Sequence, residues 1–190
     1  MGGTAPPGMT AAAIKTATSI EENTMSAAST PAESTAAVTT ADLYDERGDE
    51  LASVSLQFQS LGGRSHFSGQ ARTIRCFQDN ALVKSTLATP GNGQVLVVDG
   101  GGSLGTALMG DMIAESAVAN GWAGVVINGA IRDREAIAAL DLGVKALGSN
   151  PRKSAKAGAG EVDVDVEIDG VAIRPGCMIW CDPDGILVER

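Results

Sequence analysis

The chain has 190 residues, enough for one domain with a sizeable hydrophobic core. Its formal net charge of −9 argues against binding to a nucleic-acid backbone, because that backbone is held by a basic face. Aromatic residues make up only 3% of the chain, so we expect a core of aliphatic side chains. A small anionic ligand would need a local positive site on so acidic a protein.

We expect a cytoplasmic protein that makes no contact with a membrane. No apolar run reaches the ~18 residues of a membrane span, and no stretch resembles a signal peptide. Three cysteines are too few for a disulfide framework. Cys177 and Cys181 lie in a strand-like run that would hold them ~13 Å apart, so we expect all three thiols to be reduced. The only histidine, His66, rules out a histidine-rich metal site.

Residues 1–39 form a segment of different composition, dominated by Ala, Thr, Ser, Gly and Pro. Such a segment buries too little apolar surface to offset its ordering entropy, so we expect a disordered tail. Met25 lies within it and offers a second start, while the scarcity of arginine argues against a transit peptide. The folded domain is predicted to occupy residues 40–190.

The first part of this domain mixes short helices and strands. Thr40 to Asp45 has the pattern of a capped helix. Turns are expected at 61–63 and 89–93. The further predictions here are strands at 54–58 and 69–77 and a helix at 80–87.

The central stretch runs from Val95 to Asp133 and reads VLVVDGGGSLGTALMGDMIAESAVANGWAGVVINGAIRD. Its continuous apolar runs predict strands buried on both faces. Its helix would have one apolar face and end at Gly121. The predicted order is strand 95–98, Gly-rich turn 100–102, helix 111–120 and strand 125–131, followed by helix 134–140 and strand 143–147.

The C-terminal part changes to strand periodicity. Residues 161–168 alternate strictly between apolar and acidic, which predicts a strand with one wet face. Asp169-Gly170 is a hairpin turn signal. Strands are expected at 171–174, 176–181 and 186–188, with a turn at 182–185. The predicted fold class is therefore α/β, with a parallel strand–helix–strand unit in the middle and a β-rich C-terminal part.

A right-handed unit of this kind brings three segments to one edge of the sheet. They are the turn Gly100–Gly102, the helix start Gly110–Asp111 and the pair Arg132–Asp133. Ligands of open α/β sheets bind at this edge. We therefore expect a small-molecule site there.

The residue types at this edge suit a small oxo acid. Free backbone N–H groups of Met112 and Ile113 can hold a carboxylate. Arg132 can bind the same anion through two parallel hydrogen bonds. Asp133 can bind a divalent cation whose shell is completed by waters and substrate oxygens. Asp111 can act as a base, directly or through a water.

Each residue also has a structural interpretation. Asp111 can cap its own helix and so occupy the amides assigned to the substrate. Asp133 can cap the helix that starts at Arg134, and Arg132 can be a solvated strand end. The convergence of all of them on one edge favours a site.

Other motifs are weaker. Gly100 to Gly105 fits the dinucleotide pattern G-x-G-x-x-G, but no helix opens within the glycines and the next strand ends in Arg132. A methyltransferase interpretation has the same weakness. The acidic stripe of residues 161–167 indicates a wet strand face, and Asp182 with Asp184 indicates a turn. Arg152, Lys153 and Lys156 form a basic patch that is more typical of a solvated loop than of a substrate clamp.

At these residues the chain resembles the RraA-like proteins, over about Thr40 to Arg190. The family is named for a regulator of ribonuclease activity and includes class II 4-hydroxy-4-methyl-2-oxoglutarate aldolases. The segments that carry the resemblance are GGRSHFSG, VLVVDGGGSLGTAL, GDMIAESAVANGWAGVVINGAIRD, LGVKALGSNPRKS, GAGE and DPDGI. Active members carry Gly or Asp, twenty residues and then Arg-Asp, which Asp111 and Arg132-Asp133 match.

The resemblance implies roles for these residues. Arg132 would bind the substrate carboxylate, and Asp133 would anchor a divalent cation, Mg²⁺ or Mn²⁺. The backbone amides from Gly110 through Asp111 and Met112 to Ile113 would contact the substrate. It also implies a swivelling β/β/α domain and a homotrimer with sites at subunit interfaces, to which a neighbouring subunit can add an acidic residue.

Two details of the pattern bear on activity. Members that act only as ribonuclease regulators tend to lose the Asp after the Arg, and this chain keeps Asp133. The pattern often has an acidic residue three positions further on, where this chain has Ala136 beside Glu135. That departure concerns an outer contact of the metal rather than the core of the site.

The leading hypothesis is a metal-dependent lyase that cleaves 4-hydroxy-4-methyl-2-oxoglutarate to two pyruvates. Oxaloacetate decarboxylation, which passes through the same enolate, would be a secondary activity. The alternative is a non-catalytic protein that binds and inhibits an endoribonuclease. A third hypothesis, a methyltransferase of quinone biosynthesis, predicts binding of S-adenosylmethionine, which we do not expect.

Overall fold

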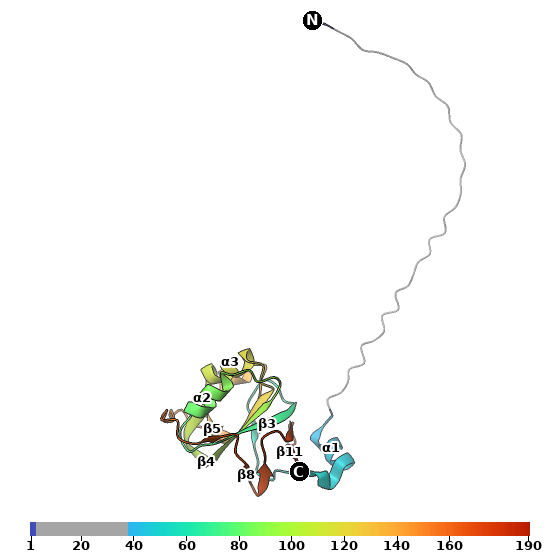
Figure 1. The fold of residues 1–190 in the computed structure, drawn as a ribbon, viewed down its shortest axis with the longest axis vertical. Coiled ribbons are helices and arrows are strands. Elements are labelled where there is room, and N and C mark those ends of the chain that lie inside the picture. Colours follow the sequence, from blue (N-terminus) through green and yellow to red (C-terminus); the bar gives the residue numbers. More distant parts are fainter. Residues whose placement is uncertain (3–37) are drawn as a thin grey trace, which may run out of the picture. The chain divides into compact units, whose positions relative to one another are not determined.

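The computed structural model describes residues 1–2 and 38–190 (Figure 1). The predicted tail therefore lies almost wholly outside the described residues, and its disorder stays a prediction. The helices are α1 (Thr40–Arg47), η1 (Gly48–Glu50, a 3₁₀ turn), α2 (Ala81–Leu87), α3 (Asp111–Ala119) and α4 (Arg134–Ala138). The strands are β1 (Leu51–Ser53), β2 (Gln59–Ser60), β3 (Phe67–Arg75), β4 (Val95–Met109), β5 (Gly124–Ile131), β6 (Gly143–Ser149), β7 (Glu161–Val162), β8 (Val166–Ile168), β9 (Val171–Ile173), β10 (Met178–Cys181) and β11 (Ile186–Glu189).

The main sheet of the described domain has the strand order β1-β11-β10-β3-β4-β5-β6-β2, with β7 paired to β3. The four strands β3 to β6 run parallel, and the flanking pairs are antiparallel. β8 and β9 form a separate hairpin. The predicted parallel unit and the β-rich C-terminal part are both confirmed.

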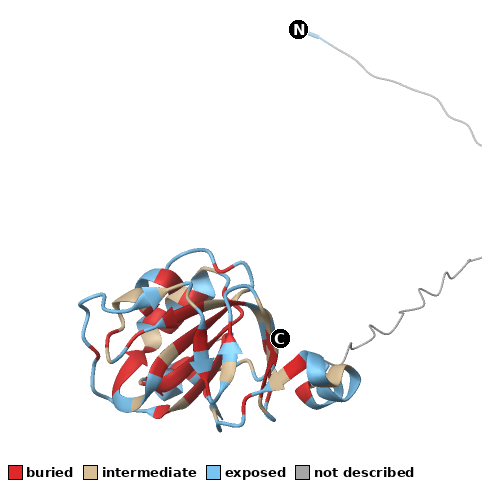
Figure 2. Cartoon of the chain, turned by 60° about the horizontal axis from the view of Figure 1, so that its bottom comes forward, coloured by how far each residue is buried: buried red, intermediate tan, exposed pale blue. Residues whose placement is uncertain are grey.

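The domain has the layers of a β/β/α fold. In Figure 1, α2 and α3 lie on one side of β3, β4 and β5, and β8 lies on the other. Successive side chains of β4 point to opposite faces of the sheet, so this strand contributes to the packing on both sides. Leu96 and Val98 pack in the helix-side core, whereas Val95 and Val97 pack with the C-terminal strands. All four are fully buried, and Figure 2 shows burial running through the sheet.

Helices α1 and α3 begin where the sequence predicts, whereas α1 ends two residues later than predicted and α3 one residue earlier. Thr39 Oγ1 accepts a hydrogen bond from the Asp42 amide at 3.1 Å and so caps α1. The buried face of α3 consists of Ile113, Ala114 and Ala117, and the chain leaves the helix through Asn120 and a left-handed Gly121.

The predicted strand at 54–58 is wrong. The chain forms β1 before it and β2 after it, and these two strands pair at opposite ends of the sheet. Residues 54–58 therefore cross from one end to the other and cannot pair along their length.

The predicted strand at 161–168 is broken into β7 and β8. At the break, Asp163 has a φ of +57°, and its carboxylate is held by Arg72 Nε at 3.0 Å. The break lets β7 pair with β3 and β8 pair with β9. The hairpin turn predicted at Asp169-Gly170 is confirmed, since both residues have the positive φ of such a turn.

The glycine stretch is not a turn that ends a strand. β4 continues through it to Met109, with register shifts against β5 after Asp99, Ser103 and Ala107. Gly101 and Gly102 have φ values of +65° and +70°, which lets the strand bulge and then resume its pairing. Gly100–Gly102 is therefore a bulge within β4.

The thiol prediction is confirmed, because Cys76, Cys177 and Cys181 are all free. Burial raises the pKa of Cys76 to about 11, so this thiol stays protonated and unreactive at neutral pH. Within residues 38–190, no helix is long and apolar enough to cross a membrane.

Candidate active site

The ends of β4 and β5 place the site, because these parallel strands finish in register. Met109 is paired with Ile131, and the Arg132 amide donates to the Met109 carbonyl at 2.9 Å. The residues that follow on each strand, Gly110 and Arg132, must then lie side by side. The predicted convergence holds for the helix start and the Arg132–Asp133 pair, but the glycine bulge does not take part.

Asp133 joins the two strand ends. Its Oδ2 lies 3.2 Å from Arg132 Nε and accepts a hydrogen bond from the Asp111 amide at 3.3 Å. Its side chain makes no capping hydrogen bond to α4, so Asp133 does not cap the helix that starts at Arg134. Asp133 also has a φ of +58°, a conformation that is uncommon outside glycine and is often found at functional sites.

Asp111 caps its own helix in part, which was the structural interpretation of this residue. Its Oδ1 accepts a hydrogen bond from the Met112 amide at 2.7 Å, and the Ile113 amide donates to the Gly110 carbonyl at 3.2 Å. The expectation that these two N–H groups are free is therefore wrong, because the short polar side chain and the helix turn satisfy them. Both residues still line the cavity described below, and their part in binding stays a prediction.

Gly110 is required by the space around it. A Cβ at this position would lie 2.6 Å from Asp133 Oδ2 and 2.9 Å from Arg132 Nε. Its φ of −135° is open to any residue, so the constraint is contact rather than conformation. Glycine here allows the helix start to approach the Arg132–Asp133 pair.

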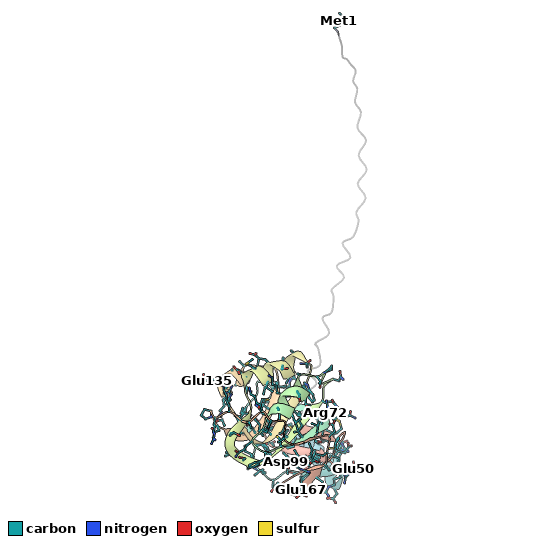
Figure 3. The ribbon with its side chains drawn as sticks, turned by 60° about the vertical axis from the view of Figure 1, so that its left-hand side comes forward. Met1, Glu50, Arg72, Asp99, Glu135 and Glu167 are labelled. Carbon is teal, nitrogen blue, oxygen red and sulfur yellow. The ribbon has the colours of Figure 1, made fainter. Side chains whose placement is uncertain are left out.

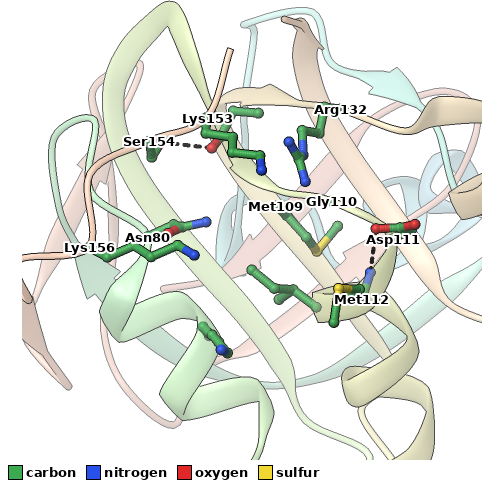
Figure 4. Close-up of a pocket in the computed structure, with 12 residues that line it drawn as sticks. Asn80, Met109, Gly110, Asp111, Met112, Arg132, Lys153, Ser154 and Lys156 are labelled. Carbon is green, nitrogen blue, oxygen red and sulfur yellow. Dashed lines mark hydrogen bonds between the residues drawn. The ribbon is translucent and has the colours of Figure 1, made fainter. Parts of the chain in front are cut away.

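A cavity of about 200 Å³ opens beside these residues. Figure 4 shows Arg132 and Asp111 on one side of it and Asn80 and Lys156 on the other, with the Lys153 side chain extending between them toward Arg132. The floor is apolar, with Met109 and Ile113 among its residues. The complete lining is Asn80, Lys84, Ala107, Met109, Gly110, Asp111, Met112, Ile113, Arg132, Lys153, Ser154 and Lys156.

Four cationic side chains, Lys84, Arg132, Lys153 and Lys156, line this cavity against one carboxylate, Asp111. In a chain of net charge −9, this is the local positive site that a small anion requires. Lys153 and Lys156 are exposed and lie in a loop, as the sequence predicts, and both also line the cavity. A part for them in binding substrate stays a prediction. Their position after β6, the next parallel strand, places them at the same sheet edge and could have identified them.

Asn80 also lines the cavity. Its Oδ1 is buried and has no hydrogen-bond partner among the described residues. Figure 4 shows the Asn80 amide nitrogen, not this oxygen, toward the cavity.

A second hollow, of about 570 Å³, lies on the other side of Arg132. Asp111 and Arg132 border both hollows, whereas Asp133, Glu135 and Asn150 border only this one. Figure 3 shows Glu135 far from Glu167 of the acidic stripe, so the stripe is not part of the site. Within the described ranges, no three His, Cys, Asp or Glu side chains gather closely enough to form a metal site by themselves.

The fold and the site together define a β/β/α domain with a cavity, lined by four cationic side chains, where its parallel strands end. The sequence model of the family described as RraA-like (Aldolase/RraA) matches residues 40–188. The chain belongs to the RraA-like family.

Solved structures agree with this assignment. A protein of Geobacillus kaustophilus HTA426, named as an S-adenosylmethionine:2-dimethylmenaquinone methyltransferase, is 48% identical over 80% of this chain and 94% of its own, with a TM-score of 0.78. The RNA-processing inhibitor RraA from Thermus thermophilus is also 48% identical, over 80% and 92% of the two chains, with a TM-score of 0.77. An unusual member of the RNase ES inhibitor RraA family from Streptomyces coelicolor is 29% identical, over 77% and 75%, with a TM-score of 0.63.

Proposed function

We propose that this protein is a divalent-metal-dependent lyase that cleaves 4-hydroxy-4-methyl-2-oxoglutarate into two molecules of pyruvate and decarboxylates oxaloacetate more slowly. The observation that carries the proposal is the arrangement of Arg132 and Asp133 beside Gly110. Family membership supports it at the level of class, since the family includes aldolases.

Arg132 is suited to bind the carboxylate of a 2-oxo acid. Its Nε faces Asp133, while neither Nη atom has a hydrogen-bond partner within the described part of the chain. The ion pair fixes the plane of the guanidinium and leaves its outer edge open. Two parallel hydrogen bonds from that edge match the geometry of a carboxylate.

Asp133 fits a hard divalent cation. Its Oδ2 is engaged by Arg132 and Asp111, whereas Oδ1 has no partner among the described residues. Glu135 and Asn150 border the same hollow and offer further oxygen atoms. Mg²⁺ or Mn²⁺ accepts one carboxylate with waters and substrate oxygens as its shell. Such an ion would supply Lewis-acid stabilisation of the charge that develops on the 2-oxo group.

Asp111 is the candidate base. Its Oδ1 is held by the Met112 amide, which leaves Oδ2 to take the proton of the C4 hydroxyl, directly or through a water. As the hydroxyl becomes a carbonyl, the C3–C4 bond breaks and its electron pair forms the enolate of pyruvate. Return of the proton to C3 completes the second pyruvate. In oxaloacetate, loss of CO₂ leaves the same enolate without the first proton transfer.

The lysines are suited to hold the second carboxylate of such a substrate. Lys84, Lys153 and Lys156 line the same cavity as Arg132, and a dicarboxylic oxo acid carries charge at both ends. The apolar floor at Met109 and Ile113 suits the C4 methyl group.

The test is release of pyruvate by the purified full chain, followed through lactate dehydrogenase and NADH. Both substrates are assayed with Mg²⁺, with Mn²⁺ and with chelator, and the rate without protein is subtracted. We expect metal-dependent turnover that chelator abolishes and excess Mg²⁺ restores. No turnover of either substrate with either metal would contradict the proposal.

A second candidate function is inhibition of an endoribonuclease, favoured by the 48% identity to the Thermus RNA-processing inhibitor. It predicts that the chain lowers the cleavage rate of a purified endoribonuclease without any pyruvate release.

We also propose a homotrimer, the assembly that the family resemblance implies, which light scattering of the purified chain would test. The bulged glycine stretch opens no helix, so we expect no binding of S-adenosylmethionine in calorimetry.

A further inference from the structure

We propose that Asp79 is a positioning residue, whose buried carboxylate sets the place of the cavity lysines by joining helix α2 to the segment Lys153–Gly158. Asp79 does not line the cavity and is 2% exposed. It acts only through the backbone of the two segments that carry the lining lysines.

The hydrogen bonds of Asp79 connect both segments. Its Oδ1 accepts from the Ala81 amide at 2.9 Å, in the first turn of α2, one turn before Lys84. Oδ1 also accepts from the Gly158 amide at 3.3 Å, and Oδ2 accepts from the Ala157 amide at 2.6 Å. These amide bonds lower the pKa of the Asp79 carboxyl although burial opposes them, so it is ionised at neutral pH.

Lys156 lies between two fixed residues. On its N-terminal side, the Ala155 amide donates to the Gln78 carbonyl at 2.9 Å and the Ala155 carbonyl accepts from the Asn80 amide at 3.1 Å. On its other side, Ala157 is held by Asp79. With its neighbours fixed, the backbone of Lys156 has one orientation, which directs the side chain to the cavity (Figure 4).

The other end of the segment is fixed independently of Asp79. Ser154 Oγ donates to the Ala107 carbonyl at 2.7 Å and lies 2.9 Å from Thr106 Oγ1, both on β4. Lys153 is bridged to Ala107 of the same strand. Loss of the Asp79 carboxylate should therefore release Lys156 more than Lys153.

The kinetic test is a double-mutant cycle, and it rests on the proposed function. Asp79→Asn should raise the KM for oxaloacetate about 10-fold, the loss expected for one misplaced charged contact. In a Lys156→Ala background the same change should alter KM less than about 2-fold, because the residue through which Asp79 acts is gone. Equal effects in both backgrounds would overturn the proposal.

A second measurement needs no catalysis and so separates this proposal from the proposed function. Lysine side chains are labelled by reductive ¹³C-methylation, and the Lys153 and Lys156 signals are assigned with Lys→Arg variants. Lys156 is already exposed, so the readout is a change in its surroundings: in Asp79→Asn, the Lys156 signal should shift from its native position while the Lys153 signal stays. An unmoved Lys156 signal would overturn the proposal even if the chain has no lyase activity.

Asp79→Ser is the companion variant in case Asp79→Asn folds poorly. A serine hydroxyl can still accept from the Ala81 amide two residues on, but it is too short to reach Ala157 and Gly158. The variant should therefore retain α2 and show the same Lys156 shift. Asp79→Ser with a native Lys156 signal would contradict a role for the carboxylate.

Discussion

Asp133 Oδ2 lies 3.2 Å from Nε of Arg132, so each of these neighbouring residues fixes the orientation of the other. The pair also holds the start of α3, because the same oxygen accepts the Asp111 amide. The strand ends, the helix start and the two charged side chains thus form one unit.

Removal of the Arg132 guanidinium should abolish substrate binding. For Arg132→Ala we expect kcat/KM to fall at least ~100-fold, since charge-assisted hydrogen bonds each contribute about 1.5–3 kcal/mol. Arg132→Lys should recover little, because an ammonium cannot make two parallel hydrogen bonds in one plane. Steady-state kinetics on oxaloacetate checks both, with Arg174→Ala, an exposed arginine outside the site, as the control.

A side chain at position 110 should disturb the site without unfolding the domain. The Cβ of Gly110→Ala would lie 2.6 Å from Asp133 Oδ2, so the Arg132–Asp133 pair must shift. Small misplacements of reacting groups cost about 100-fold in rate, and we expect a loss of that order in kcat/KM. Gly185→Ala is the matched control, because its Cβ would meet nothing within 4 Å. Equal activity of the two variants would contradict the tight contact at Gly110.

The cavity lysines should strengthen the binding of a doubly charged substrate. Lys156→Ala and Lys153→Ala should each raise the KM for oxaloacetate about 10-fold, the effect of one charged contact. Added salt should raise the KM of the native protein as well, because it screens the cations. Arg152→Ala is the control, since this neighbouring arginine does not line the cavity. A KM that is indifferent to both lysines would remove them from the substrate site.

Much of this site could be predicted from the sequence, because it depends on local periodicity. The apolar runs at Val95 and Val125, with the helix between them, were sufficient to predict two parallel strands and a helix start at Gly110 on the same edge as Arg132. The first strand was predicted to end at Val98, whereas β4 continues to Met109. The bulge in β4 was not predictable, since it depends on pairing with β5 at distant positions. The occupied Met112 amide depends on the rotamer of Asp111, which no pattern encodes.

The position of Lys153 and Lys156 at the cavity could not be predicted from composition. Arg152, Lys153 and Lys156 form an exposed loop, as predicted, and only tertiary contacts to Gln78, Asp79 and Ala107 bring that loop to the cavity. The strand at 54–58 was not formed because β1 and β2 pair at opposite ends of the main sheet, and the strand at 161–168 is broken because β7 pairs with β3 whereas β8 pairs with β9 in a separate sheet.

Acid should destabilise the domain through Asp182, which is 2% exposed. Burial alone would raise its pKa, but hydrogen bonds from Thr40, Gly185 and Asp184 outweigh burial and lower it below the ordinary value of 3.8. A carboxyl with a lowered folded-state pKa stabilises the protein above its unfolded pKa, and this stability is lost as pH falls through the folded pKa.

The corresponding variant is Asp182→Asn, which keeps the shape but removes the charge. We expect it to lower the free energy of unfolding at pH 7 by about 1–3 kcal/mol. Urea denaturation between pH 7 and pH 3 should show a smaller acid-induced loss in the variant than in the native chain. Parallel pH profiles of the two proteins would contradict the assignment.

The most direct measurement of the proposed function is the rate of pyruvate release from oxaloacetate by Asp133→Ala at saturating Mg²⁺. Circular dichroism and light scattering confirm that the variant is folded and assembled like the native chain. Asp45→Asn, an exposed carboxylate on α1, serves as the matched control. We predict that Asp133→Ala falls to the rate without protein while Asp45→Asn keeps the native rate. Unchanged turnover in Asp133→Ala would contradict the assignment of this edge of the sheet as a metal-dependent lyase site.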